Sequence, residues 1–214
     1  MKKNNLNKSR KTKTRIIAPY RYLIVCEGVQ TEPNYFNTIK KIIESSFPNR
    51  MNIMVLGTGY NTLSLVDKTI QTMQKSPIKY DKVWCVFDKD SFTDDVFNSA
   101  IKKATSKDIS VAWSNEAVEL WFLLHYNFYN TPINRDQYVT KLDAIFKESF
   151  GSGYSKNDID IYEKIKICGG NLKTAINNAQ KLDNYYPSTV SPAKQNPNTH
   201  VYKLMLELYD YLVL

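Results

Sequence analysis

The stretch VWCVFDKDSF, residues 83–92, decides the predicted fold. Its first five residues are mostly apolar and predict a buried strand that runs directly into Asp88 and Asp90. Side chains at positions i and i+2 of extended backbone leave the same face, so we expect both carboxylates to point at one spot. Mg²⁺ is usually held by one or two carboxylates, water and phosphate oxygens. An Asp-x-Asp after a strand is often only a turn or helix cap, so the evidence for a functional role must come from the rest of the chain.

Strand and helix patterns alternate on both sides of this stretch. We expect strands at 22–26, 52–56, 83–87 and 109–113, followed in turn by helices at 33–47, 62–74, 94–105 and 116–126. Parallel strands need crossover connections, and these are right-handed, so this order predicts helices on both faces of a parallel sheet. The sequence therefore predicts an α/β fold with about four parallel strands whose carboxyl ends share one edge.

Acidic residues follow three of the four predicted strands. Glu27 comes directly after the first strand, as Asp88 and Asp90 come after the third, so we expect these three carboxylates to converge. Glu116 and Glu119 follow the fourth strand, one helical turn apart on one face. We interpret Glu116 as an acid that interacts with the helix macrodipole. Glu119 has large apolar neighbours in the sequence, and an acid in such a buried helix needs a specific role.

The C-terminal part has a different character. We expect helices at 138–150, 158–166, 171–182 and 199–212. The proline-containing polar stretch at 185–198 predicts a loop that is either functional or mobile. The predicted organisation is a basic arm at 1–20, an α/β core at 21–126 and a mainly helical extension at 127–214 that packs on the core.

The net charge of +8 comes from the start of the chain. Residues 1–21 contain no acid, and their basic residues are Lys2, Lys3, Lys8, Arg10, Lys11, Lys13, Arg15 and Arg21. Such a polar run cannot bury apolar area, so we expect it to be disordered when alone. It either neutralises nucleic-acid phosphates, through residues such as Lys11, Lys13 and Arg15, or is a solvated tail that aids solubility.

Composition excludes several protein classes. The chain is 43% hydrophobic and 23% charged, as in ordinary globular proteins, and its three cysteines lack zinc-site spacing. No stretch reaches the roughly 18 continuous apolar residues of a membrane span, so we expect a cytoplasmic protein without a membrane partner. Its two histidines are interpreted as structural. Lys156 is a weaker candidate for a phosphate contact, because a nucleic-acid site needs cations to offset the substrate charge.

The combination of Glu27 with Asp88 and Asp90 resembles the Toprim fold, in which a glutamate follows the first strand and an Asp-x-Asp follows the third. That fold is shared by topoisomerases, bacterial primases and the overcoming-lysogenization-defect nucleases. More closely, the chain resembles the RloB family. The similar stretches are LIVCEGVQTEPNYF (23–36), VWCVFDKD (83–90), SNEAVELWFLLHY (114–126) and NPNTHVYKLMLEL (196–208).

The third of these stretches departs from the family pattern. Where the family usually has Asn-Pro-Cys-Phe-Glu-Leu-Trp, this chain has NEAVELW at 115–121. The glutamate before Leu-Trp is kept as Glu119, which favours a functional role for Glu119 and leaves Glu116 as local variation.

The resemblance implies a Mg²⁺-dependent nuclease, with Mn²⁺ able to substitute, that acts in prokaryotic anti-phage or abortive-infection defence. Family members are often encoded beside an ABC-type or AAA-type ATPase, so nucleic acid and such an ATPase are the expected partners. Asp88 and Asp90 would hold the metal. Glu27 would share the metal or act as general acid or base, and Glu119 would complete the acidic shell.

Two other functions stay open. A non-catalytic regulatory subunit would bind nucleic acid or an ATPase through the basic arm and the helical extension. A phosphohydrolase with an aspartate nucleophile is less consistent, because that class has its motif after the first strand and usually Thr or Val where this chain has Phe92. The sequence leaves open whether the substrate is DNA or RNA, and whether the chain forms a homo-oligomer.

Overall fold

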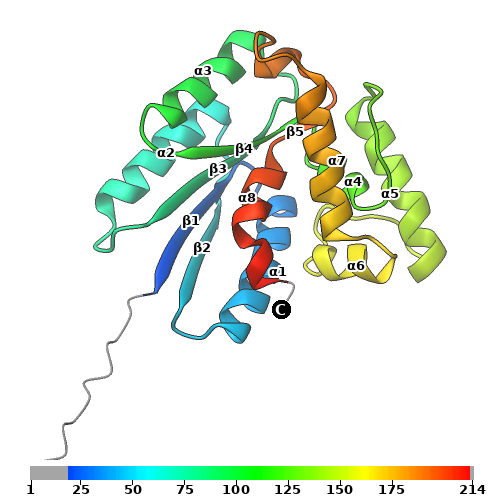
Figure 1. The fold of residues 1–214 in the computed structure, drawn as a ribbon, viewed down its shortest axis with the longest axis horizontal. Helices are drawn as coiled ribbons and strands as arrows, with labels where there is room; N and C mark the ends of the chain where they lie inside the picture. Colours follow the sequence, from blue (N-terminus) through cyan, green and yellow to red (C-terminus); the bar gives the residue numbers. More distant parts are fainter. Residues whose placement is uncertain (1–18, 213–214) are drawn as a thin grey trace, which may run out of the picture.

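The computed structural model describes residues 19–212, which form an α/β fold built on one five-stranded sheet (Figure 1). The strands are β1 (Tyr20–Cys26), β2 (Met51–Gly57), β3 (Lys82–Asp88), β4 (Ser110–Asn115) and β5 (Asn198–Thr199). Their order across the sheet is β2-β1-β3-β4-β5. The first four strands are parallel, and β5 runs antiparallel to β4. The predicted α/β class is confirmed. The prediction of about four parallel strands did not include the antiparallel β5.

Helices cover both faces of the sheet. The α-helices are α1 (Thr31–Ser46), α2 (Thr62–Lys75), α3 (Asp94–Thr105), α4 (Glu119–Leu124), α5 (Arg135–Phe150), α6 (Ile161–Ile167), α7 (Leu172–Tyr185) and α8 (Val201–Leu208), and the short 3₁₀ helices are η1 (Pro192–Lys194) and η2 (Tyr209–Tyr211). One face packs on α2 and α3, and the other on α1, α4 and the C-terminal helices (Figure 1). None of the helices within residues 19–212 has both the length and the apolar character needed to cross a membrane.

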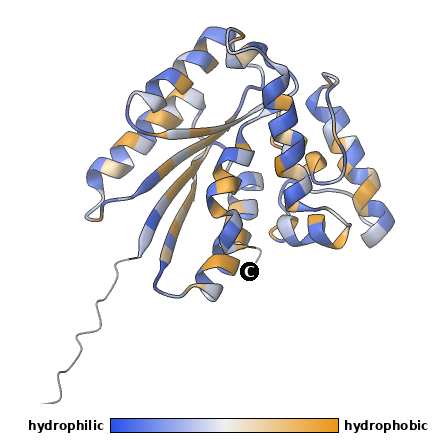
Figure 2. Ribbon diagram, in the orientation of Figure 1, coloured by the Kyte–Doolittle hydropathy of each residue, from blue (hydrophilic) through white to orange (hydrophobic). Residues whose placement is uncertain are grey.

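The interior strand β1 shows how the sequence builds two cores. Tyr22, Ile24 and Cys26 point into the cluster with α1 and the C-terminal helices, and Leu23 and Val25 point into the cluster with α2 and α3. This alternation follows from the two-residue period of a strand, with both faces apolar because both are covered. Apolar and polar segments alternate along the covering helices (Figure 2), as expected for helices with one buried face.

The predicted element bounds differ from the structure most at the first helix after β4. A helix was expected at 116–126, but α4 comprises only Glu119–Leu124, because the chain first turns away from the end of β4. The helix expected at 138–150 begins earlier, at Arg135. There Asn134 accepts a hydrogen bond from the Gln137 backbone, and the Gln137 side chain accepts one from the Asn134 backbone, which is a capping box.

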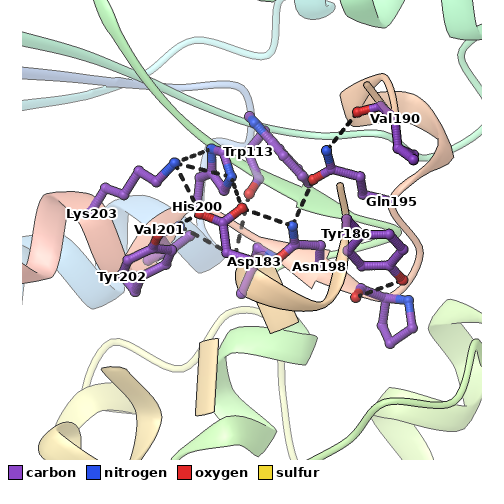
Figure 3. Close-up of polar contacts among 12 residues, drawn as sticks. Trp113, Asp183, Tyr186, Val190, Gln195, Asn198, His200, Val201, Tyr202 and Lys203 are labelled. Carbon is purple, nitrogen blue, oxygen red and sulfur yellow. Dashed lines mark hydrogen bonds and ion pairs between the residues drawn. The ribbon is translucent and has the colours of Figure 1, made fainter. Parts of the chain in front are cut away.

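The C-terminal segment returns to the sheet and is fixed there by a polar cluster around Asp183 (Figure 3). The Asp183 carboxylate contacts His200 Nε2 at 2.8 Å and the Tyr202 hydroxyl at 2.6 Å, and Lys203 Nζ lies 3.2 Å from it. Asn198 donates a further hydrogen bond to it. Burial raises the pKa of Asp183, but the hydrogen bonds from His200 and Tyr202 lower it more, to well below its usual range. This cluster therefore joins α7 to β5 and α8.

We predict that Asp183→Ala lowers the free energy of unfolding by about 2 kcal/mol, because it leaves several donors without their shared acceptor. Urea denaturation of the wild type and the variant measures this loss. Asp210→Ala is the matched control, since Asp210 is exposed in η2 and should change stability by less than about 0.5 kcal/mol. Equal stabilities of the Asp183 and Asp210 variants would contradict the joining role.

Candidate functional site

A cavity of about 260 Å³ lies beyond the carboxyl ends of β1 and β3. Its lining residues are Glu27, Gly28, Thr31, Glu32, Asp88, Asp90, Val118, Glu119, Arg135 and Lys156. Five of these are acidic and two are basic, so the lining carries an excess of negative charge when all the groups are ionised. The structure thus brings together the four predicted catalytic residues, Glu27, Asp88, Asp90 and Glu119, in one concave site.

Glu27 joins the ends of the neighbouring strands β1 and β3. It directly follows β1, and its Oε2 accepts a hydrogen bond of 3.3 Å from the backbone N–H of Asp88 at the end of β3. The next residue, Gly28, lies so close to α1 that an added Cβ would be 2.3 Å from Glu32 Oε2. A glycine is therefore needed at this turn for the Glu32 carboxylate to reach the cavity.

Asp88 and Asp90 converge on the same spot, as predicted, but by a different backbone path. Asp88 is the last residue of β3, whereas Asp90 has a φ of +40° and is not part of an extended strand. Aspartate adopts this left-handed conformation more readily than most residues. The Asp90 N–H donates a 3.2 Å hydrogen bond to the backbone carbonyl of Glu116, which ties the turn after β3 to the segment after β4.

Glu32 and Glu119 form the buried wall of the cavity, with only 6% and 2% of their surface exposed. Glu119 is the first residue of α4, and its Oε1 accepts a 3.1 Å hydrogen bond from the Tyr154 hydroxyl. Glu32 belongs to the first turn of α1. Glu119, an acid in the apolar sequence of α4, is therefore buried and hydrogen-bonded.

Burial and crowding of negative charge disfavour full ionisation of this site. Burial, and then the negative charges of Glu32 and Asp90, raise the pKa of Glu27 to about 7, although the Asp88 N–H opposes the shift. Burial, and then the charges of Glu32 and Glu119, raise the pKa of Asp88 well above its usual range. Burial likewise raises the pKa of Glu32. Each of these shifts favours the protonated, neutral carboxyl over the carboxylate in the metal-free site.

Arg135 is the important site residue that the sequence did not suggest. Its Nη2 lies 3.1 Å from Asp88 Oδ2 and its Nη1 lies 3.1 Å from Asp90 Oδ2. Arg135 is separated from these aspartates by more than 40 residues in the sequence, so no local pattern links them. The capping box at Asn134 was the available signal, because it predicts that a helix begins at Arg135.

Glu116 has a role different from the one expected. It does not lie in the first turn of its own helix, because α4 begins three residues later. Its Oε2 instead accepts a 3.1 Å hydrogen bond from the backbone N–H of Arg135, so it pairs with the N-terminus of α5. Glu116 thereby helps to position Arg135 over the aspartates.

Lys156 lies at the cavity, as its predicted phosphate contact would require. Its Nζ is 4.0 Å from Glu119 Oε1, and its side chain is 51% exposed. The surrounding loop is held against α1, because Thr31 Oγ1 donates to the Lys156 carbonyl and Thr38 Oγ1 donates to the Ile159 carbonyl. The other predicted phosphate contacts, Lys11, Lys13 and Arg15, lie outside the described residues.

The chemistry of the cavity fits a hard divalent cation, because its donors are carboxylate oxygens. The observed side-chain positions in the described part of the chain, in contrast, do not form a metal site. Within residues 19–212, no three His, Cys, Asp or Glu side chains are gathered closely enough to hold a metal ion together. The Arg135 guanidinium contacts both aspartates where such an ion would have to bind. Binding of a metal therefore requires Arg135 and some of the carboxylates to move.

We predict that the stability of the metal-free protein falls as the pH rises from 5 to 8. The pKa of Glu27 is about 7 in the folded chain and near 4.3 in an unfolded one, so the folded state binds the extra proton in this range. Removing this proton should cost on the order of 1 kcal/mol, a value reduced for the partial exposure of Glu27 to solvent.

The measurement is the free energy of unfolding in urea at each pH. Glu27→Gln should show a smaller fall than the wild type, while Glu148→Gln, an exposed change on α5, should retain the full fall. An identical pH dependence in the Glu27→Gln variant and the wild type would show that the Glu27 carboxyl is not buried as described.

Comparison with known proteins gives one match. A family model described as RloB-like protein matches residues 22–208, a range that includes every residue lining the cavity. No curated protein and no solved structure matches the chain.

Proposed function

The chain belongs to the RloB-like family, and from this premise we propose that it is a metal-dependent nuclease with a Toprim-like catalytic core. The observation that carries the proposal is the cavity at the carboxyl ends of β1 and β3, where five carboxylates from β-strand ends and helix starts meet. Ligands of open α/β sheets bind at this edge. A crowded set of carboxylates is stable at neutral pH only with protons or cations, and phosphodiester cleavage is a reaction that uses such cations.

The order of the elements supports the Toprim-like assignment. Glu27 follows β1, the Asp88-x-Asp90 pair follows β3, and these two strands are hydrogen-bonded neighbours in the middle of the sheet. The backbone contact between Asp88 and Glu27 joins the two parts of the motif directly. The antiparallel β5 and the helices α5 to α8 would then be additions of this family to the core.

The chain's own residues account for the steps of the proposed reaction. Asp88 and Asp90 would be the metal ligands, and a bound Mg²⁺ or Mn²⁺ would supply Lewis-acid stabilisation of the phosphate and a more acidic water. Glu27, with a pKa of about 7, can accept or release a proton near neutral pH, as a general base or acid must. Glu119, fixed by the Tyr154 hydroxyl, would orient the surrounding groups.

The two cations at the cavity suit a phosphate substrate. Lys156 is half exposed, so it can contact a phosphate from solvent, and Arg135 adds a planar guanidinium to the same cavity. We propose nucleic acid as the substrate on this basis. The anti-phage role, the cytoplasmic location and the ABC-type or AAA-type ATPase partner are proposed from family membership alone.

One observation favours the alternative of a non-catalytic regulatory subunit. Arg135 pairs with both aspartates, so the site as it stands has neutralised the residues that would bind a metal. A protein that only binds nucleic acid or a partner could use this ion pair permanently, as a structural element. Measured metal binding and cleavage separate the two functions.

We predict that Asp88→Asn reduces Mg²⁺-dependent or Mn²⁺-dependent cleavage of plasmid DNA and transfer RNA at least about a hundredfold, because it removes a charged metal ligand. Gel assays with both substrates measure the rate and identify the preferred nucleic acid. Asp95→Asn, an exposed aspartate at the start of α3, should cleave like the wild type. Undiminished cleavage by the Asp88 variant would remove the metal role assigned to Asp88.

A further inference from the structure

Arg135 uses its two terminal nitrogens to hold two different carboxylates. Nη2 lies 3.1 Å from Asp88 Oδ2, and Nη1 lies 3.1 Å from Asp90 Oδ2. The Asp88 side chain is only 14% exposed, so this contact is shielded from solvent and stronger than a surface ion pair. The guanidinium is therefore the main compensation for the negative charge of the Asp-x-Asp pair.

The backbone of Arg135 is fixed, but its side chain is not fully satisfied. The capping box of Asn134 and Gln137 sets the start of α5, and Glu116 accepts the Arg135 backbone N–H. The Arg135 Nε, in contrast, is buried without a hydrogen-bond partner among the described residues. A buried donor without an acceptor costs free energy. The observed position therefore leaves one Arg135 donor unpaired, and the anchored backbone keeps the guanidinium near the cavity in other side-chain conformations.

A divalent cation and Arg135 compete for the Oδ2 atoms of Asp88 and Asp90. Mg²⁺ binds carboxylate oxygens at about 2.1 Å, and the oxygens in question already contact the guanidinium nitrogens. A metal on the same oxygens would bring two like charges within a few ångströms of each other in a partly buried site, which is strongly unfavourable. A metal bound through the Oδ2 atoms of the two aspartates therefore competes with Arg135 for the same oxygens.

We propose that Arg135 is an internal counter-cation that a divalent metal displaces, and that the released guanidinium then binds a phosphate group of the substrate. This proposal rests on the metal-dependent function proposed above. Phosphate is the fitting ligand for the released group, because it offers the paired acceptor oxygens that match the guanidinium. Without metal, Arg135 thus offsets the charge of Asp88 and Asp90, and the site becomes competent for a phosphodiester only with metal.

The test is Mn²⁺ binding to the full chain, measured by titration calorimetry at one pH. Arg135→Met should bind Mn²⁺ about tenfold more tightly than the wild type, because the competing cation is gone. Lys156→Met is the matched control: it removes one positive charge from the same cavity, but among the residues that the structure describes the Lys156 ammonium pairs with Glu119 alone, at 4.0 Å. It should change the affinity by no more than about threefold.

The outcomes separate the two proposals. If Arg135→Met binds Mn²⁺ no more tightly than the wild type, the displacement is overturned and the metal site stays in place. The same holds if Arg135→Met and Lys156→Met gain the same affinity. An absence of Mn²⁺ binding by the wild type and by both variants would overturn the proposed metal-dependent function itself, and the displacement with it.

A second measurement uses the wild type and does not depend on the folding of any variant. In NMR spectra of the arginine side chains, rotation about the Cζ–Nη bonds of Arg135 should be slow without metal, because both nitrogens are held. Addition of Mg²⁺ should make this rotation fast. Slow rotation that persists at saturating Mg²⁺ would show that the ion pairs survive metal binding, and would overturn the proposal.

Discussion

The structure depends on one electrostatic constraint: the cavity encloses five carboxylates, and among residues 19–212 two side-chain cations line it. Like charges at this density in a partly buried site cannot all be ionised without compensation. The raised pKa values of Glu27, Glu32 and Asp88 are the direct expression of this constraint. Such an arrangement costs stability, and the proposed cation site would account for it.

The parallel sheet creates this crowding. Because β1 and β3 are adjacent and parallel, the residues that follow them emerge side by side at one edge. The Glu27 carboxylate therefore reaches the backbone of Asp88 across neighbouring strands. The turn at Gly28 then leaves room for the carboxylate of Glu32, from the first turn of α1, to approach the same point. The fold thus converts positions that are remote in the sequence into a single charged site.

Four of the five carboxylates, those of Glu27, Asp88, Asp90 and Glu119, could be predicted from the sequence, because strand ends are marked by apolar runs and parallel strands end together. The position of Arg135 could not, since it depends on how α5 packs against the sheet, and no periodicity encodes that. The two-residue β5 was missed for a related reason: so short a strand has no alternating pattern. Glu116 shows the same limit, because its partner is the start of a helix from a later part of the chain.

The central claim is that Asp88 and Asp90 can coordinate a divalent cation at the carboxyl edge of the sheet. The most direct measurement is a crystal structure of the protein grown with Mn²⁺, with anomalous scattering used to locate the ion. The account predicts an anomalous peak about 2.2 Å from carboxylate oxygens of both aspartates, with the Arg135 guanidinium turned away from them. The account is contradicted if well-ordered crystals grown in Mn²⁺ show no anomalous peak in the cavity and Arg135 is still paired with both aspartates.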